Sequence, residues 1–114
     1  METTDAVTAL SALAQESRLE VFRLLVQTGR DGLAAGDIAE RLGISPATLS
    51  FHLAQLRHAG LATMRRDGRS LIYSADYDGM NDLMGFLTEN CCGGTMACAP
   101  ARRANQPRSR GARP

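Results

Sequence analysis

The segment between Ser45 and Gly60 constrains the fold of this chain more than any other part of the sequence. Ser45 can cap the N-terminus of a helix, and Pro46 suits the first helical position, where a missing N–H costs nothing. Apolar residues then repeat at a helical spacing, at Leu49, Leu53 and Leu56. The segment therefore predicts an amphipathic helix that ends at Gly60.

A shorter helix is expected directly before it, over about 36–42, with Ile38 and Leu42 one turn apart. Gly43 ends this helix, so a tight turn at Gly43-Ile44 joins the two. Two helices joined in this way form a helix-turn-helix, whose second helix enters the major groove of DNA with its N-terminal end first.

The hydrophobic pattern changes from helical to alternating after Gly60. Two runs, 61–66 and 69–74, flank the pair Asp67-Gly68. An Asp-Gly pair between such runs predicts a β-hairpin with a type I′ turn, in which both central residues have a positive φ. A helix-turn-helix followed by such a hairpin, or wing, is a far more specific signal than the helix pair alone.

Three further helices are expected, together with a loop over 32–36. The first spans about 5–15. The second begins at Ser17, which forms a capping box with Glu20, and it ends at Gly29. Its apolar stripe consists of Leu19, Phe22, Leu25 and Val26. The last helix spans about 76–89, and its apolar side consists of Tyr77, Met80, Leu83, Met84 and Leu87.

The expected fold class is mainly α with a β-hairpin wing (α+β), a winged helix-turn-helix of about five helices and two strands. We expect one domain over 1–90, a cysteine segment over 91–98 and an Arg/Pro-rich, disordered tail over 99–114. The sequence has no apolar run of membrane-spanning length, and its acidic N-terminus lacks the features of a signal peptide. The expected location is therefore cytoplasmic, without a membrane partner.

The formal net charge of +1 conceals an asymmetry, and all 13 basic residues are arginines. Residues 1–100 hold eight arginines against twelve acids, a net charge of −4, whereas 101–114 hold five arginines and no acid. Four of the eight arginines lie between positions 57 and 69. The local position of these arginines, rather than the total charge, is the indication of nucleic-acid binding.

The outward face of the predicted reading helix and the hairpin tip supply the candidate DNA contacts. They are Ala47, Thr48, Ser50, Phe51, His52, Gln55, Arg65, Arg66 and Arg69. Gln55 suits adenine, Phe51 suits the thymine methyl group, and the arginines suit the DNA backbone or minor groove. Purely structural roles for these residues stay open. Phe51 could pack under the wing or a neighbouring helix, His52 could be a structural hydrogen-bonding group, and the hairpin tip could be solvated without contacting DNA.

Five stretches of the chain together resemble the ArsR/SmtB family of metal-sensing repressors. They are 19–25 (LEVFRLL), 37–43 (DIAERLG), 48–53 (TLSFHL), 56–61 (LRHAGL) and the hairpin 66–69 (RDGR). The resemblance implies a homodimer that binds an inverted repeat in double-stranded operator DNA, with the first and last helices at the interface. The interface residues would be Val7, Leu10, Leu13, Met80, Leu83, Met84 and Leu87.

Departures from the family pattern limit what the resemblance transfers. Founding arsenic sensors carry Cys-Val-Cys-Asp where this chain has Ala34-Ala35-Gly36-Asp37, so those ligands are missing. The zinc site on the last helix is not supported either, because that helix has no histidine. Many members have Gln or Ser at the start of the reading helix and a basic residue before its histidine; here Pro46-Ala47 and Phe51 stand there.

The only three cysteines, Cys91, Cys92 and Cys98, follow the last predicted helix. Thiolates are the ligands that soft ions select, and trivalent arsenic or antimony binds three sulfurs in a pyramid. Gly93 and Gly94 supply a backbone flexible enough to fold the third cysteine back. The spacing resembles a subgroup of arsenic-responsive members with C-terminal ligands, so As(III) or Sb(III) is the expected inducer. Its capture would reorient the last helix and release the DNA.

Other roles for the cysteines stay open. They are an organoarsenical site, a cadmium, lead or mercury site, a redox switch, a structural zinc site and no role at all. An enzyme is a further class, such as a thiol-dependent arsenate reductase with a Cys-x5-Arg motif. The residues six positions after the cysteines are Ala97, Cys98 and Ala104, so that motif is missing and no enzyme is expected.

Overall fold

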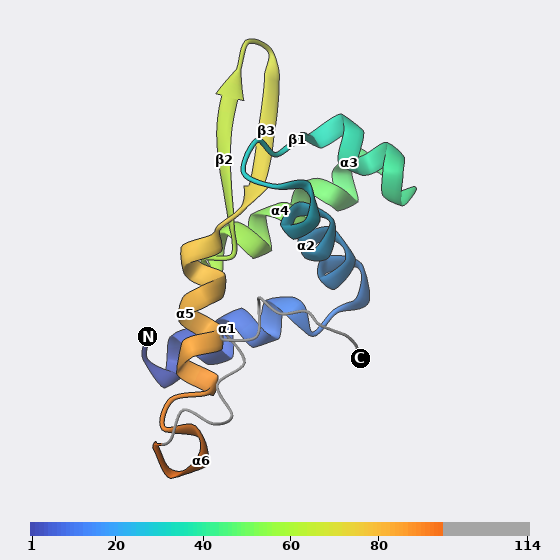
Figure 1. Ribbon diagram of the computed structural model, residues 1–114. Coiled ribbons are helices and arrows are strands. Elements are labelled where there is room, and N and C mark those ends of the chain that lie inside the picture. Colours follow the sequence, from blue (N-terminus) through green and yellow to red (C-terminus); the bar gives the residue numbers. More distant parts are fainter. Residues whose placement is uncertain (95–114) are drawn as a thin grey trace, which may run out of the picture. The chain divides into compact units, whose positions relative to one another are not determined.

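The computed structural model describes residues 1–94, which form six helices and a three-stranded antiparallel sheet (Figure 1). The helices are α1 (Thr3–Leu13), α2 (Glu16–Thr28), α3 (Ala35–Leu42), α4 (Pro46–His58), α5 (Tyr77–Leu87) and α6 (Cys91–Gly94). The strands are β1 (Leu33–Ala34), β2 (Ala62–Asp67) and β3 (Ser70–Ala75). Within this described part, no helix is long and apolar enough to span a bilayer. The chain divides into two compact units, 1–83 and the residues from Met84 onward, which we describe separately.

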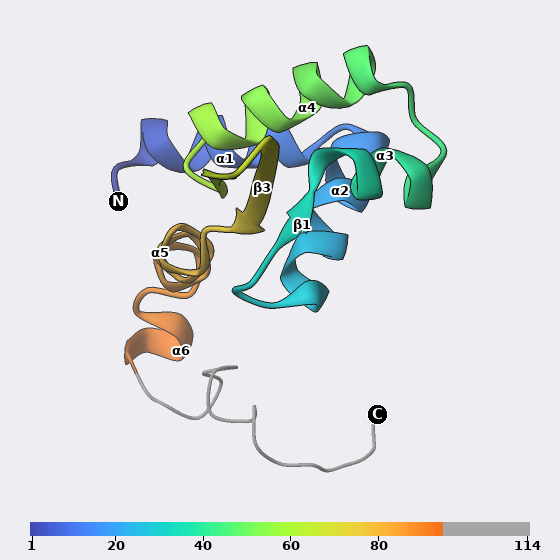
Figure 2. The same cartoon turned by 90° about the horizontal axis from the view of Figure 1, so that it is seen from above.

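The core of the first unit confirms the leucine pattern of the reading helix. Leu49, Leu53 and Leu56 of α4 are each at most 1% exposed. They lie with other fully buried side chains: Val21, Leu25, Ile38 and Leu61. Figure 2 shows α4 along one edge of this unit, with α1 and α2 next to it. The leucine face of α4 thus packs against the core, and the opposite face of the helix is directed outward.

The ends of the two reading-head helices confirm the expected caps. The Thr48 backbone N–H donates to the Ser45 Oγ at 3.3 Å, and Pro46 occupies the first helical turn of α4. Gly43 ends α3 in the left-handed region with φ 65°, a conformation that is cheap for glycine. These two local signals fix the turn between α3 and α4.

The start of α2 corrects the predicted capping box. The N-cap is Gln15, whose backbone is extended and whose Oε1 accepts from the Arg18 N–H at 2.9 Å. Ser17 lies inside the helix, so it cannot be the cap. Leu19, predicted in the buried stripe, is 42% exposed, and the buried residues of α2 are Val21, Phe22 and Leu25.

The sheet holds a strand that the sequence reading missed. Residues 32–36 were expected to be a loop, but Leu33 pairs with Tyr73 and Ala34 with Ile72, giving the order β1-β3-β2. A strand of two residues carries no periodic signal of its own, and its partner lies about forty positions further along the chain. The added strand links the middle of β3 to the start of α3.

The hairpin forms where expected, but its turn is shifted by one residue. Asp67 pairs with Ser70, so the two central residues are Gly68 and Arg69. Gly68 has φ 65°, whereas neither Asp67 nor Arg69 has a positive φ. A glycine with positive φ at the first central position is typical of a type II′ turn, so the predicted type I′ turn at Asp67-Gly68 is wrong. The shift places Arg69 at the tip of the hairpin.

A close backbone approach fixes where α5 begins. The Gly79 N–H donates to the Asp76 Oδ1 at 3.0 Å, which caps the first turn of α5. Gly79 also lies so close to the Gly60 carbonyl that a Cβ atom at position 79 would overlap it. Only glycine therefore fits at position 79, and α5 starts directly against the junction between α4 and β2.

Candidate nucleic-acid interface

The outward face of α4 carries five of the six DNA-contacting residues predicted on this helix. Ala47, Thr48, Ser50, Phe51 and Gln55 are all exposed. Three of them, Ala47, Phe51 and Gln55, are spaced four residues apart, so they form one strip along successive turns. The geometry makes these side chains available to a groove, and their contacts with bases stay predictions.

The Thr48 hydroxyl is positioned to donate a hydrogen bond to a partner outside the protein. The Ser45 hydroxyl donates to the Thr48 Oγ1 at 3.0 Å while it accepts from the Thr48 N–H. Because the Thr48 hydroxyl oxygen is already used as an acceptor, its hydrogen is left to donate to an acceptor outside the protein. A phosphate oxygen at the entrance of the groove is an acceptor of this kind.

Phe51 lies on the surface, so the alternative in which it packs under the wing or a neighbouring helix is wrong. Its side chain is 57% exposed. Its ring lies next to that of the neighbouring His52, at a centroid distance of 5.9 Å and an interplanar angle of 59°. A large apolar ring therefore points away from the core, on the face where DNA would lie.

His52 is 7% exposed, which favours its structural alternative over a phosphate contact. The Arg18 Nη1 lies 3.4 Å from the His52 Nδ1, and the Arg18 Nε donates to the Ala12 carbonyl at 2.8 Å. Burial, and then the positive charge of Arg18, lower the pKa of His52 from its ordinary value of 6.5. A neutral His52 with Nδ1 as acceptor thus links α4 to α2 and, through Arg18, to the end of α1. We remove His52 from the DNA-facing set.

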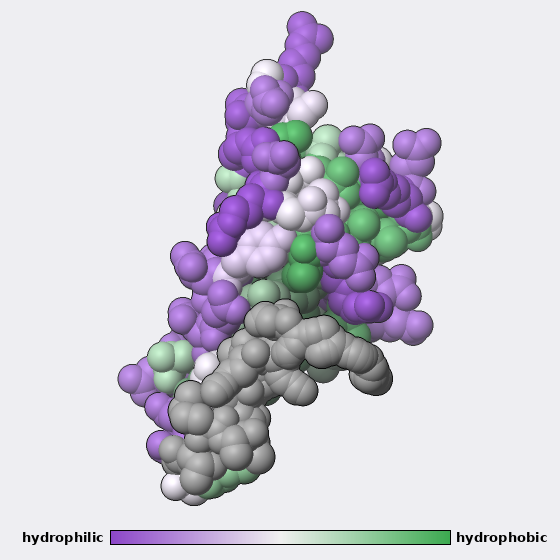
Figure 3. Space-filling view, in the orientation of Figure 1, coloured by the Kyte–Doolittle hydropathy of each residue, from purple (hydrophilic) through white to green (hydrophobic). Residues whose placement is uncertain are grey.

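The hairpin tip exposes all three predicted arginines, Arg65, Arg66 and Arg69. Arg65 and Arg66 are consecutive strand residues, so they lie on opposite faces of the hairpin, and Arg69 lies in the turn. Figure 1 shows the hairpin projecting beyond the helices of the first unit, and Figure 3 shows hydrophilic residues over its tip. The wing therefore presents positive charge on both faces and at its end.

The predicted dimer residues differ in their exposure. Val7 and Leu10 of α1 are 56% and 42% exposed, because the core face of this helix consists of Ala6, Ala9 and Ala12. Leu13 and Met80 are half-buried. Leu83 is 5% exposed within the described chain, so its assignment to a dimer interface is wrong. In the second unit, Met84 and Leu87 are 49% and 57% exposed.

The cysteine segment is described only in part. Cys91 is half-buried and Cys92 is exposed. Cys92 is disulfide-bonded, and the Cys91 thiol lies 3.6 Å from its sulfur, as a donor to it. Cys92 has φ 55°, a left-handed conformation that costs a residue with a side chain about 1 kcal/mol or more. The third predicted ligand, Cys98, and the tail 99–114 lie outside the described residues.

Comparisons with known proteins agree with this reading head. A family model described as a helix-turn-helix domain matches residues 13–65. The nodulation protein NolR of Rhizobium meliloti is 35% identical over 80 residues, which cover 70% of this chain and 63% of that protein, slightly less than two thirds of its length. The structure of HlyU from Vibrio cholerae is 33% identical, covers 76% of this chain and 97% of that one, and has a TM-score of 0.60.

Two further matches carry the family's name or its architecture. A Halobacterium salinarum protein, provisionally named the arsenical resistance operon repressor ArsR, is 40% identical over 63 residues, covering 55% of this chain and 48% of that protein. The solution structure of Mb0332 from Mycobacterium bovis, a homodimeric winged helix-turn-helix DNA-binding domain, is 27% identical with a TM-score of 0.62, covering 79% of this chain and 83% of that one. This chain belongs to the ArsR family of winged helix-turn-helix transcriptional regulators.

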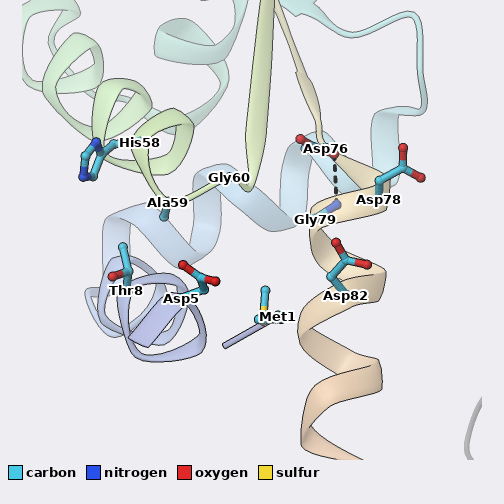
Figure 4. Close-up of a pocket in the computed structure, with 10 residues that line it drawn as sticks. All are labelled: Met1, Asp5, Thr8, His58, Ala59, Gly60, Asp76, Asp78, Gly79 and Asp82. Carbon is cyan, nitrogen blue, oxygen red and sulfur yellow. Dashed lines mark hydrogen bonds between the residues drawn. The ribbon is translucent and has the colours of Figure 1, made fainter. Parts of the chain in front are cut away.

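A hollow in the first unit is a further candidate for a ligand site. It has a volume of about 580 Å³ and includes Asp5, His58, Asp76, Asp78 and Asp82 in its lining (Figure 4). Asp5 accepts from the Glu2 N–H at 3.1 Å, and Asp76 accepts from the Gly79 N–H. Within the described residues, no group of three or more such side chains is arranged to hold a metal ion. We therefore assign these carboxylates to helix capping and solvent.

The sequence reading missed Arg18, which organises the buried side of the site. Its neighbours in sequence, Ser17 and Leu19, were read as cap and core. The hydrogen bonds of Arg18 reach Ala12 and His52, and the second partner lies 34 positions away. A single arginine in an amphipathic helix is usually solvated, so no local signal identified it.

Proposed function

We propose that this ArsR-family regulator is a repressor that binds operator DNA as a homodimer and releases it when As(III), or Sb(III), binds Cys91, Cys92 and Cys98. The operator is double-stranded and contains an inverted repeat. The observation that supports As(III) or Sb(III) as the inducer is the pair of neighbouring cysteines, Cys91 and Cys92. Thiolates are the ligands that soft ions select, and two neighbouring thiolates can bind one such ion together. The Cys91 and Cys92 sulfurs lie 3.6 Å apart while Cys92 is disulfide-bonded, so reduction of Cys92 has to precede capture of an ion by the pair.

The backbone around the pair supports a functional role for it. Asn90 and Cys92 are the two described residues other than glycine with a positive φ, 59° and 55°. Such conformations persist where function or surrounding structure requires them. They fall within positions 90–92, which begin three residues after the end of α5. A ligand that fixes this segment acts on the C-terminal end of α5.

The dimer is supported by the apolar surface that the single chain leaves open. Val7 and Leu10 of α1 face outward although each is a large apolar side chain. Burying such groups contributes about 1.5–3 kcal/mol each, which favours an apolar partner surface. A second copy of the chain offers the same surface, as a two-fold interface requires. In such a dimer, two copies of α4 read the two half-sites of an inverted repeat.

The test is a titration of arsenite into the protein bound to a fluorescent duplex from its own promoter, with a reductant present. We expect arsenite to lower the operator affinity by about 5- to 150-fold, the usual range for coupled sites. Cys91→Ser, Cys92→Ser and Cys98→Ser should each lose most of that response. Thr88→Ala, which removes a nearby hydroxyl and no sulfur, is the matched control and should keep it.

Two results would contradict the proposal. An operator affinity that is the same with and without arsenite refutes the inducer. Release of DNA by an oxidant such as diamide, together with no effect of arsenite, assigns the three cysteines to redox sensing instead.

A further inference from the structure

The outward face of α4 has no charged side chain along its first three turns. Between Pro46 and Leu56 the helix contains no Asp, Glu, Lys or Arg, and its one histidine, His52, is buried. The first charged residue on the helix is Arg57, at its C-terminal end. In the major groove, guanine is read mainly by Arg or Lys, and cytosine by Asp or Glu. This face therefore lacks the charged groups that most often read a G·C pair.

Phe51 is the exception among the large apolar side chains of α4. The three leucines of the helix are at most 1% exposed, whereas Phe51 is 57% exposed. It lies in the middle of the exposed strip, one turn after Ala47 and one turn before Gln55. An aromatic ring at this place needs an apolar surface on the partner. The base edges of the major groove offer only one apolar group, the 5-methyl group of thymine.

We propose that Phe51 is a specificity-determining residue, which contacts the 5-methyl group of a thymine in each operator half-site. This proposal rests on the proposed DNA-binding function. The small side chain of Ala47 leaves room for the helix to approach the bases, and Gln55 is placed to read an adjacent adenine.

The experiment uses the full chain and duplexes enriched by it from a randomised DNA library. Each thymine of the enriched half-site is replaced by deoxyuridine, which removes the methyl group and keeps the base pairing. We expect one thymine position per half-site at which this change weakens binding about fourfold, the effect of removing one buried methyl group. Replacement in both half-sites should weaken binding about fifteenfold.

Phe51→Ala tests whether the phenylalanine reads that methyl group. The variant should bind more weakly than the parent, and it should bind thymine and deoxyuridine duplexes equally. Leu19→Ala is the matched control, because Leu19 is also an exposed apolar residue but lies on α2. It should keep the full thymine preference. Circular dichroism establishes that both variants are folded.

A second arm separates the methyl group from the base pair that carries it. At the sensitive position, the T·A pair is replaced by C·G and then by 5-methylcytosine·G. The parent should bind the methylated duplex more tightly than the unmethylated one, whereas Phe51→Ala should not distinguish them.

The outcomes separate this proposal from the DNA-binding function beneath it. If no duplex is enriched, the DNA-binding function itself fails. If a duplex is enriched but deoxyuridine has no effect at any position, or has the same effect on the parent and Phe51→Ala, the role of Phe51 is overturned and DNA binding stands.

Discussion

The reading helix and the wing are neighbours in sequence, yet they expose opposite chemistry. The outward face of α4 has hydroxyl, amide and apolar groups and no charge before Arg57. The tip of the β2-β3 hairpin exposes Arg65, Arg66 and Arg69 within five residues. Charged contacts to phosphates are long-ranged and independent of sequence, whereas uncharged contacts to base edges are short-ranged and specific. On the proposed DNA-binding function, we therefore expect the wing to supply affinity and α4 to supply selectivity.

The largest effect is expected from removing the three wing arginines together. Arg65→Ala/Arg66→Ala/Arg69→Ala should weaken binding to specific and scrambled duplexes alike, by about a hundredfold or more near 0.15 M salt. A dimer would lose up to six phosphate contacts, so the slope of log affinity against log salt should become less negative by up to about 5. Fluorescence anisotropy across a salt series measures both.

The control for the wing variant is Arg23→Ala, which removes an exposed arginine of α2. It should leave the salt slope almost unchanged. A triple variant that lost specific binding but kept its salt slope would reverse the roles of the two surfaces.

The next effect concerns the junction that holds the wing beside α4. Gly79→Ala places a Cβ on the Gly60 carbonyl, so we expect it to destabilise the fold by about 1–3 kcal/mol. Gly85→Ala in the same helix meets nothing within 4 Å and should be neutral, or should stabilise by up to about 1 kcal/mol. Urea unfolding of the pair measures the difference. Equal stabilities would mean that α5 does not start against this junction.

A smaller, selective effect is expected at Gln55. Gln55→Ala should weaken binding to the enriched duplex about tenfold, because a bidentate contact with adenine contributes about 1–3 kcal/mol of discrimination. Binding to a scrambled duplex and the salt slope should not change. A parallel loss on both duplexes would move Gln55 from the reading role to the backbone-binding role.

The smallest effect is a dependence of stability on pH from His52. Its pKa is lowered in the folded protein, so the unfolded chain binds more protons as the pH falls below about 6.5. The contribution of neutral His52 is therefore present above pH 6.5 and is lost progressively below it. Thermal unfolding between pH 5 and 8 should show this trend in the parent and in His58→Gln. The trend should be weaker in His52→Gln, and an unchanged trend there would contradict the account.

Local signals predicted the reading head well, and non-local contacts account for what was missed. The Ser45 cap, the Gly43 stop and the leucine repeat each act within one or two turns, and all three are confirmed. The burial of His52 depends on Arg18, 34 positions away, and β1 depends on a partner strand much further along the chain. Neither contact can be predicted from the residues next to it in the sequence.

The candidate site shows the same division. Exposure of Ala47, Thr48, Ser50, Phe51 and Gln55 followed from helical periodicity once the core face was known. The hairpin turn was misplaced by one residue because strand pairing, and not the Asp-Gly pair, set the register. Leu83 was assigned to an interface because an apolar helix face looks the same in sequence whether its own core or a second chain covers it.

The central claim, that arsenite capture and operator binding oppose each other, has one direct test. Linkage requires that operator DNA weaken arsenite binding by the same factor by which arsenite weakens operator binding. Isothermal titration calorimetry of arsenite into the free protein and into the operator complex, with a reductant present, measures that factor. The account predicts an affinity about 5- to 150-fold lower in the complex. Equal affinities in the two titrations would contradict it.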